Sequence, residues 1–470
     1  MKITFIGHAS ILIEAGGITI LSDPWRQGPC FGAQWWNYPL PYLEAIEACR
    51  IDYIYISHGH NDHLHPDTLR TLNKEAKVLV SATTDLAASI RELGFEVIEV
   101  SGSEALPLGN NGVSCRIIET YDGDTLMTVT DETEVCVNLN DALHSAPDGV
   151  QRSFIPQLKA LYPKIDYVFC GYGVASHFPN CYVIPGKDRE ATAARRQQYF
   201  NRQWARLIGE LAPVYGFPFA ADVVFLEKDL FWVNEVTHNA ERPTIAFREL
   251  YPHSPVITID LAPGFAIDNG HVTREVLRQP LLASELQTSC ADEIVQANRH
   301  GSISDEAIWE VTVLLERNLN MCAEYLRSYE GNYSVLIRLR DGKCGFCFKK
   351  NGRELSVTPL QVTAMEGHDL VYTTRLPYLE SALTRPYEDE ILFVGSGGVF
   401  EYAQESSARR NLHRELIPLL RQQDTPMPSR YGNHSRAVFT AKQRIKRMLG
   451  RTGPDLYDLG EWTVFNHEKG

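Results

Sequence analysis

The feature that most constrains the fold of this chain is a short run of potential metal ligands, His58-Gly59-His60-Asn61-Asp62-His63. It directly follows residues 51–57, a nearly continuous apolar stretch that is typical of a strand covered on both faces. Residues two apart at a strand end point to the same side, so His58 and His60 can converge on one ion. The turn that follows lets Asp62 and His63 face a second ion. The pattern therefore predicts a fold in which one strand end supplies most of a dinuclear metal site.

Short apolar stretches separated by glycines and turns fill the first half of the chain. They include residues 3–6, 10–14, 18–21, 78–81, 96–100, 114–118, 126–129, 134–139 and 166–170. Helical patterns lie between some of them, for example at 65–73, 84–93 and 191–211. Many strands with interspersed helices predict an α/β fold in which a sandwich of sheets is flanked by helices.

The second half of the chain changes in pattern, and we predict a separate unit there. Residues 305–329 have the spacing of a long amphipathic helix, and several strand-like stretches follow them. A chain of 470 residues is too long for one compact core, which favours more than one domain. We predict a catalytic domain at 1–275, a smaller α+β accessory domain at 280–425, and a basic tail with a short amphipathic helix at 426–470.

Composition narrows the partners and the compartment that we expect. The net charge of -14 argues against nucleic acid as the main partner, because phosphate binding needs a basic face. No apolar run approaches the length of a membrane span. The 10 cysteines are scattered and lie largely in apolar stretches, which is typical of thiols in a reducing compartment and not of a disulfide framework. We therefore expect a cytoplasmic protein that acts on a small-molecule substrate.

The ligand run matches, residue for residue, the His-x-His-x-Asp-His motif of the metallo-β-lactamase superfamily, which this chain resembles. Two early segments are similar to those of the superfamily members that act on nucleotide sugars, lipids and sugar lactones: Gly7-His8-Ala9-Ser10 and Ser22-Asp23-Pro24-Trp25. Within that subset the chain resembles the catalytic part of CMP-N-acetylneuraminate hydroxylases, through Trp35-Trp36, Pro218-Phe219-Ala220 and Asp260-Leu261-Ala262-Pro263-Gly264. The resemblance covers residues 1–270 and implies an αββα sandwich.

The resemblance also implies further metal ligands on later strands. A bridging carboxylate is expected at the end of one of them, and Asp141 fits that position. The superfamily's usual histidine between the two motifs is missing. Glu119 is the first candidate for its place and Asp122 the second, the alternative being that both are ordinary turn carboxylates. The last ligand stays open between His177, His238 and neither.

Two more residues are expected to take part in the active site. His8 follows the first strand, and in the enzymes that the chain resembles this position lines the mouth of the active site. A capping or core role is the alternative for His8. Asp23 is expected to orient the metal-binding loop through hydrogen bonds, because ligating histidines need acceptors for their second ring nitrogen.

The ligand set leaves two metals and two reactions open. Three histidines suit zinc, whereas two histidines with a carboxylate and open positions suit iron and oxygen chemistry. Some di-iron oxygenases of the superfamily resemble this chain in having a glutamate in place of the middle histidine. We therefore favour two iron ions over zinc, and a non-haem di-iron oxygenase acting on a polar metabolite over a zinc hydrolase of an ester, amide or phosphodiester. A non-catalytic binding protein is the third hypothesis, and the intact ligand run argues against it.

One expected partner follows from what the resemblance leaves out. Vertebrate-type CMP-sialate hydroxylases carry a Rieske iron–sulfur domain, whose Cys-x-His and Cys-x-x-His pairs do not occur in these 470 residues. The resemblance therefore covers the metal domain without a built-in source of electrons. If the protein is an oxygenase, we expect a separate reductase or electron-transfer partner.

Overall fold

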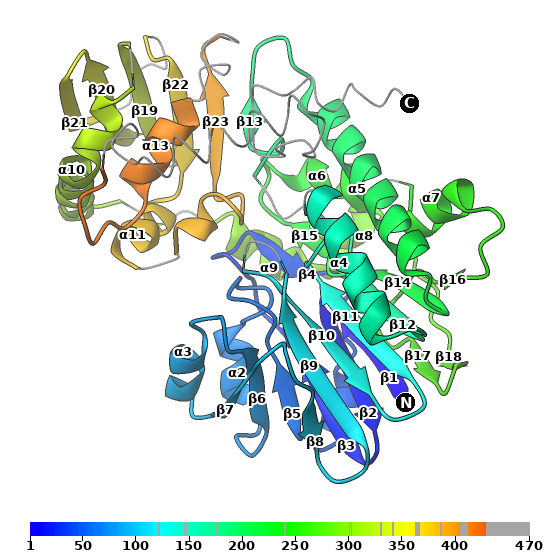
Figure 1. Cartoon of the computed structure of the whole chain (residues 1–470). Coiled ribbons are helices and arrows are strands. Elements are labelled where there is room, and N and C mark those ends of the chain that lie inside the picture. Colours follow the sequence, from blue (N-terminus) through cyan, green and yellow to red (C-terminus); the bar gives the residue numbers. More distant parts are fainter. Residues whose placement is uncertain are drawn as a thin grey trace.

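The fold is seen in a computed structural model of the chain (Figure 1). The structure describes residues 1–120, 123–144, 146, 148–173, 177–238, 241–299, 301, 303–329, 331–340, 343–361, 367–385, 388–404 and 412–428. Asp122 and the predicted basic tail from residue 429 onward lie outside the described residues.

The first sheet has the strand order β18-β17-β1-β2-β3-β5-β6-β7. Its strands are β1 (Lys2–Gly7), β2 (Ser10–Ala15), β3 (Ile18–Ser22), β5 (Tyr53–Tyr55), β6 (Lys77–Ser81), β7 (Glu96–Val100), β17 (Ala266–Asp268) and β18 (His271–Arg274). β1, β2 and β3 form an antiparallel meander, and β3, β5, β6 and β7 run parallel. β17 returns from much later in the chain to pair with β1.

The second sheet has the strand order β16-β14-β12-β11-β10-β9-β8. Its strands are β8 (Leu106–Leu108), β9 (Val113–Glu119), β10 (Thr125–Thr130), β11 (Val135–Asn140), β12 (Tyr167–Gly171), β14 (Tyr215–Phe219) and β16 (Ile257–Thr258). β8 to β11 are antiparallel neighbours, whereas β11, β12, β14 and β16 run parallel.

The two sheets pack face to face, and helices cover both outer faces (Figure 1). Between the sheets, Ile3 of the first sheet shares a core with Phe169 of the second. On the outer face of the first sheet, Ile54 belongs to a core that includes side chains of α1 (Leu43–Glu47), α2 (Pro66–Thr71) and α3 (Ala87–Glu92). On the outer face of the second, Val168 packs with α4 (Asp148–Leu161), α5 (Arg189–Leu211) and α7 (Pro243–Leu250). Coverage of both faces explains the continuous apolar strands, and the predicted αββα sandwich is confirmed.

A third sheet lies beside the sandwich, with the order β13-β23-β22-β19-β20-β21. Its strands are β13 (Tyr182–Val183), β19 (Tyr333–Leu339), β20 (Cys344–Asn351), β21 (Glu354–Gln361), β22 (Leu370–Thr374) and β23 (Gly398–Tyr402). The long helix α10 (Asp305–Arg327), α11 (Leu376–Thr384), the 3-10 turn η1 (Glu388–Ile391) and α13 (Leu412–Leu420) accompany it. We call this group of elements the C-terminal sheet region.

The predicted unit at 280–425 omits one strand of this sheet. β13 comes from within residues 1–275, and it pairs in parallel with β23, Tyr182 opposite Phe400. The rings of these two residues stack with centroids 4.8 Å apart. The chain therefore enters the third sheet once in mid-sequence and again near its end.

A buried charge cluster fastens the C-terminal sheet region to the sandwich. Glu227 is fully buried, and its carboxylate lies 2.9 Å from the guanidinium of Arg375 and also contacts Arg340. The Gln34 side chain donates to the same carboxylate at 2.9 Å. Because Arg340 and Arg375 belong to the C-terminal sheet region, we call these four residues the Glu227 clasp. An apolar core shared by both parts surrounds it.

The remaining described elements are short. They are β4 (Trp35–Asn37), which pairs with β15 (Val223–Phe225), and the helices α6 (Phe231–His238), α8 (Ala283–Ser289) and α9 (Ala291–Ala297). Among the helices within the described residues, none combines the length and the apolar character that crossing a membrane requires.

Candidate metal centre

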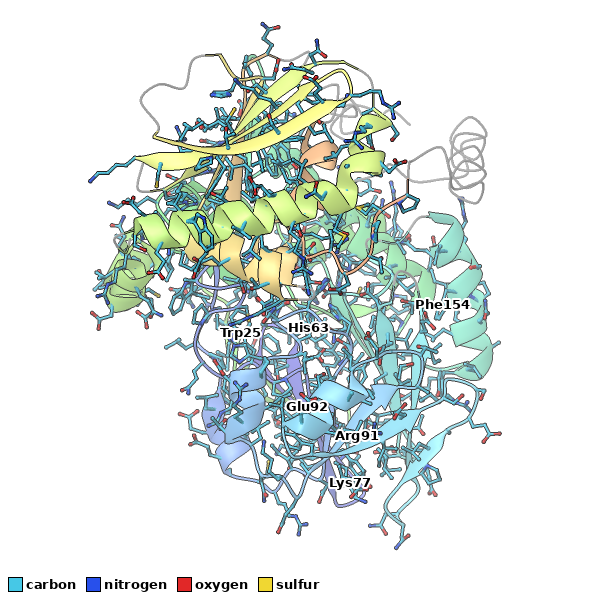
Figure 2. All side chains as sticks on the ribbon, turned by 90° about the vertical axis from the view of Figure 1, so that its left-hand side faces the viewer. Trp25, His63, Lys77, Arg91, Glu92 and Phe154 are labelled. Carbon is cyan, nitrogen blue, oxygen red and sulfur yellow. The ribbon has the colours of Figure 1, made fainter. Side chains whose placement is uncertain are left out.

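Strand direction gathers the predicted site residues at one edge of the sandwich. β1, β3 and β5 run the same way, so the residues that follow them share an edge. His8 follows β1, Asp23 follows β3, and His58 comes shortly after β5. This edge faces the C-terminal sheet region, as the position of His63 in Figure 2 shows, and Lys77 at the start of β6 lies at the opposite end.

A turn of backbone folds the ligand run back on itself. The amides of His63 and Leu64 both donate to the carbonyl of His60, at 3.0 and 2.8 Å. The ring of His63 consequently lies 4.1 Å from that of His58, centroid to centroid. The ring of His60 lies 4.5 Å from the same ring. One loop thus brings three imidazoles together.

His58 and His60 direct ring nitrogens at each other. Nε2 of His58 lies 2.7 Å from Nδ1 of His60, and Nδ1 of His58 lies 2.9 Å from the Ser57 hydroxyl. Burial lowers the pKa of His58 well below its usual range, and the neighbouring His63 and His60 lower it further. A neutral imidazole is the form that binds metal.

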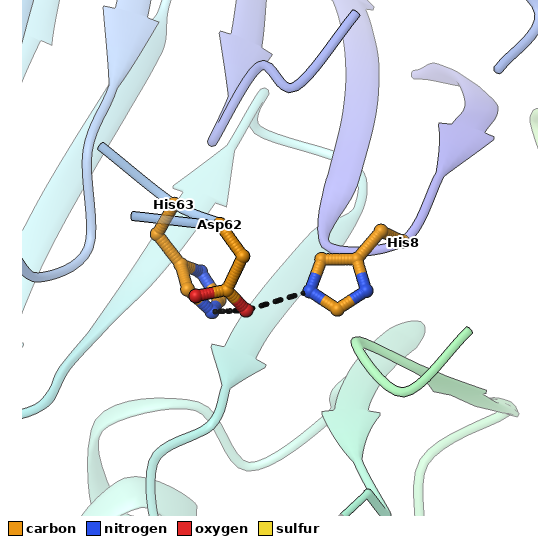
Figure 3. A group of neighbouring side chains, drawn as sticks. All are labelled: His8, Asp62 and His63. Atoms are coloured by element: carbon orange, nitrogen blue, oxygen red, sulfur yellow. Dashed lines mark hydrogen bonds and ion pairs between the residues drawn. The ribbon is translucent and has the colours of Figure 1, made fainter. Parts of the chain in front are cut away.

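A second group of side chains meets around Asp62 (Figure 3). Its Oδ2 lies 2.9 Å from Nε2 of His8 and 3.2 Å from Nε2 of His63. The same His63 nitrogen lies 3.4 Å from Oδ2 of Asp141. His63 therefore belongs to two candidate ligand sets, one with His8 and Asp62 and one with His58 and Asp141.

The charges of this group support one another in the absence of metal. Burial would raise the pKa of Asp62, but His63 and His8 hold it well below its usual range. Asp141 shows the same balance, its pKa being lowered mainly by His63 against the effect of burial. Burial opposes the charged form of His63, yet Asp62 and Asp141 raise its pKa well above the ordinary value. A buried cation therefore suits the space between the two carboxylates.

The residues present fit metal ions. Nδ1 of His8 and Oδ1 of Asp141 are buried and have no hydrogen-bond partner among the described residues. Buried polar atoms without partners are costly unless a ligand satisfies them. The donors are imidazoles and carboxylates, a set that suits iron or zinc.

Asp23 connects the two halves of the site from beneath. Its carboxylate accepts the Ser57 amide and the Ser57 hydroxyl, both at 2.8 Å, and lies 3.1 Å from Nδ1 of His63. The side-chain amide of Asn140 donates to it as well. The parallel pairing of β3 and β5 places Asp23 there, since its amide donates to the Tyr55 carbonyl. An acceptor on the second nitrogen of His63 fixes that ring.

Asp141 follows β11, whose pairing with β12 shifts register between Asn138 and Asn140. Such an irregularity re-aims the side chains at a strand end. His144, which we did not predict, holds the turn after it, with Nδ1 2.8 Å from the carbonyl of Asp141 and Nε2 3.0 Å from that of Gly173. Its place three positions after Asp141 was the only sequence signal.

Glu119 is not brought into either ligand set. It ends β9 opposite Thr125, and its side chain is exposed. The Thr125 hydroxyl donates to the Ser57 carbonyl at 2.6 Å, so Glu119 lies at the same end of the sandwich as the centre. At the surface, however, it faces solvent.

The two histidines considered for the last ligand also lie apart from the sets. The backbone amide of His177 donates to the Phe393 carbonyl, and its ring packs against Tyr182. Burial, together with Arg196, lowers the pKa of His177 to about 3. Nε2 of His238 lies 2.6 Å from the Val223 carbonyl, which occupies that nitrogen, and burial lowers its pKa to about 4.

One acidic residue near the centre was missed altogether. Glu390 lies on η1, and its Oε1 is 3.8 Å from Nε2 of His60. Burial raises the pKa of Glu390 to about 8, and Asp389 and Asp62 raise it further. In the sequence it is the last residue of an acidic triplet, and nothing in that pattern indicates a contact with a loop more than half the chain away.

A cavity opens beside the centre. His8, Asp62 and Asp141 line it, together with Phe178, Arg196 and Arg278. The cavity therefore offers both charged groups and an apolar wall to a ligand next to the candidate metal ligands.

Comparisons with known proteins agree with this arrangement. Residues 2–131 match the family described as Beta-lactamase superfamily domain. A Mycolicibacterium smegmatis protein named for a Rieske 2Fe-2S iron–sulfur group is 28% identical over 50% of this chain and 46% of its own length. The cytidine monophosphate-N-acetylneuraminic acid hydroxylase of Mus musculus is 27% identical over 58% of this chain and 48% of its own length. The chain thus spans about half the length of these relatives.

Similarity to solved structures is weaker. A metallo hydrolase from Ignicoccus hospitalis has 15% identity and a TM-score of 0.38, and covers 57% of this chain and 97% of that one. Others with comparable scores include both a beta-hydroxylase and metal-dependent hydrolases, so this likeness does not separate the two reactions. The fold, the family match and the sequence relatives together indicate a metal-dependent enzyme of the metallo-β-lactamase fold.

Proposed function

Because residues 2–131 carry a beta-lactamase superfamily domain, we propose that the chain is a metal-dependent oxygenase that oxidises a polar small molecule at a dinuclear centre. The observation that carries this proposal is the carboxylate-rich donor set: Asp62 and Asp141 lie among three histidines of one loop. Mixed imidazole and carboxylate donors with open positions suit iron and oxygen chemistry. The sequence relationship to a hydroxylase over 58% of the chain supports the same reaction class.

In this proposal His58 and His60 hold one ion, Asp62 and His63 hold the second, and Asp141 serves both. Two iron ions are favoured and zinc is the alternative. Reduced iron supplies the activation of molecular oxygen when it is bound. The protein contributes the geometry: Asp23 fixes the ring of His63, and Ser57 fixes the ring of His58.

The cavity beside the centre is the proposed substrate site. His8 presents a ring nitrogen without a partner among the described residues, so it can bond a polar group of the substrate. Arg196 and Arg278 supply positive charge along the same cavity, and Phe178 supplies an apolar wall that excludes water.

Electrons are proposed to come from a separate reductase or electron-transfer protein. One relative is named for a Rieske iron–sulfur group, whereas these 470 residues contain no Cys-x-His or Cys-x-x-His pair. Turnover should therefore depend on an added reductant.

A zinc hydrolase is the second candidate, because the same donors bind zinc and can generate a nucleophile from water. The test is to purify the protein without chelators, measure its iron and zinc content, and record oxygen consumption with an artificial reductant. His60→Ala serves as the ligand-deficient control. Protein that holds only zinc and cleaves a model ester without oxygen contradicts the oxygenase and establishes the hydrolase.

A further inference from the structure

The C-terminal sheet region reaches the metal-binding loop through one side chain. Glu390 lies outside the matched residues 2–131, yet its Oε1 is 3.8 Å from Nε2 of His60. The two side chains are 24% and 33% exposed, so both are largely screened from water. This is an ion-pair contact between a candidate ligand and a carboxylate from a distant part of the chain.

The orientation of His60 gives the contact a direction. Its Nδ1 lies 2.7 Å from Nε2 of His58, the nitrogen with which it would share an ion. Its Nε2 is on the other side of the ring and faces Glu390. A histidine that binds metal through one nitrogen usually donates the proton of the other to a carboxylate or carbonyl, which fixes the tautomer and the ring. Glu390 occupies the position of such an acceptor.

The turn that carries Glu390 is held firmly against the sandwich. The Glu390 carbonyl accepts the amides of Phe393 and Gly395, at 3.2 and 2.8 Å. A Cβ added at Gly395 would lie only 2.3 Å from Cβ of Phe31, a residue of the loop after β3. The Phe393 carbonyl in turn accepts the amide of His177. The carboxylate is therefore placed by packing from both parts of the molecule.

We propose that Glu390 is a positioning residue for His60, accepting the Nε2 proton so that Nδ1 is held toward the ion shared with His58. The inference rests on the proposed metal centre and deepens it, because it makes metal affinity depend on the C-terminal sheet region. Glu390 acts through His60 and is not itself a ligand.

The first test is metal affinity measured with cobalt(II) alone, by competition with a chromophoric chelator and by the cobalt absorption spectrum. Loss of such an acceptor typically weakens metal binding about 10- to 100-fold, and we expect this for Glu390→Ala. Glu390→Gln keeps an acceptor oxygen but loses the charge that strengthens the bond, so its affinity should lie between those of Ala and wild type. Glu388→Gln is the matched control: it makes the same change two positions away and should bind cobalt like wild type.

The second test is a double-mutant cycle with His60→Ala. If Glu390 acts through His60, adding Glu390→Ala to the His60→Ala variant causes no further loss of affinity. Losses that add on the logarithmic scale would mean that Glu390 binds the ion directly, and would overturn the positioning role. Wild-type affinity in both single Glu390 variants would overturn it as well. Should Glu390→Ala fail to fold, Glu390→Gln decides alone: affinity equal to wild type overturns the proposal.

These measurements separate the inference from the proposed reaction. Protein that binds cobalt with the expected dependence on Glu390 but consumes no oxygen contradicts the oxygenase and leaves the positioning role intact. Protein that consumes oxygen while Glu390→Ala keeps full affinity contradicts the positioning role alone.

Discussion

His60 is the ligand candidate whose side chain contributes least to the packing of the sandwich. It is 33% exposed, whereas His58 and His63 are buried, and it belongs to none of the apolar cores. His60→Ala should therefore remove most bound metal and the activity while the fold remains. Elemental analysis and thermal unfolding of the metal-free protein check this. A variant that does not fold would make the site a structural one.

His177 should make stability depend on pH without affecting metal content. Its pKa is lowered by burial and by Arg196 to about 3, so between that value and its ordinary value near 6.5 the unfolded chain binds the proton more tightly. Stability should consequently fall as the pH drops through this window, by up to about 1.4 kcal/mol per pH unit from this group.

The matched variant for that prediction is His177→Gln, which removes the titrating ring and keeps the backbone bond to Phe393. Urea unfolding between pH 4 and pH 7 should show a smaller loss of stability in the variant than in wild type. Bound metal should be unchanged. A loss of metal in His177→Gln would instead support the ligand role considered from the sequence.

The predictability of single residues followed from how local their partners are. His58, His60, Asp62 and His63 lie in one loop, so spacing alone indicated that they would meet. Glu119 was inferred from its place at the end of a strand, and strand position does not reveal whether the last side chain turns inward or toward solvent. For Glu390 the deciding contact is with a residue distant in sequence, which no local pattern encodes.

At the scale of elements, η1 and the residues after it are where packing is tightest. A Cβ at Gly395 would approach Phe31, so Gly395→Ala should lower the free energy of unfolding by about 1–3 kcal/mol, the usual cost of overpacking. Because the same turn carries Glu390, cobalt affinity should fall too. Gly301→Ala is the control, since nothing lies within 4 Å of its added Cβ. Equal stability of the two variants would show that the turn can shift without cost.

Elements with strong periodicity were predicted closely, and pairings were not. The helix expected at 191–211 is α5 (Arg189–Leu211), and the one expected at 305–329 is α10 (Asp305–Arg327). β13 went unrecognised because two residues carry no period. Its existence depends on β23, near the other end of the chain, and long-range pairing is a property of the folded molecule and not of a sequence window.

At the scale of the whole molecule, the Glu227 clasp should be a main determinant of stability. Glu227→Ala leaves Arg340 and Arg375 buried without their carboxylate, and breaking a buried ion pair in this way costs about 3–5 kcal/mol. Chemical denaturation measures the loss. Asp229→Asn is the control: Asp229 is 58% exposed and 3.8 Å from Arg340, so its change should stay within about 0.5 kcal/mol. A Glu227→Ala variant as stable as the control would contradict the role of the clasp.

The pairing of β13 with β23 has a consequence for the order of events during synthesis. β13 leaves the ribosome early, and its partner near residue 400 follows only after a delay on the order of tens of seconds at ordinary rates of translation. During that interval the ligand loop and the sandwich around it are already present, while the edge at Tyr182 and the position later filled by Glu390 wait for the rest of the chain. A nascent protein of this kind acquires its histidines first and their outermost support last, so full metal affinity belongs to the finished chain alone.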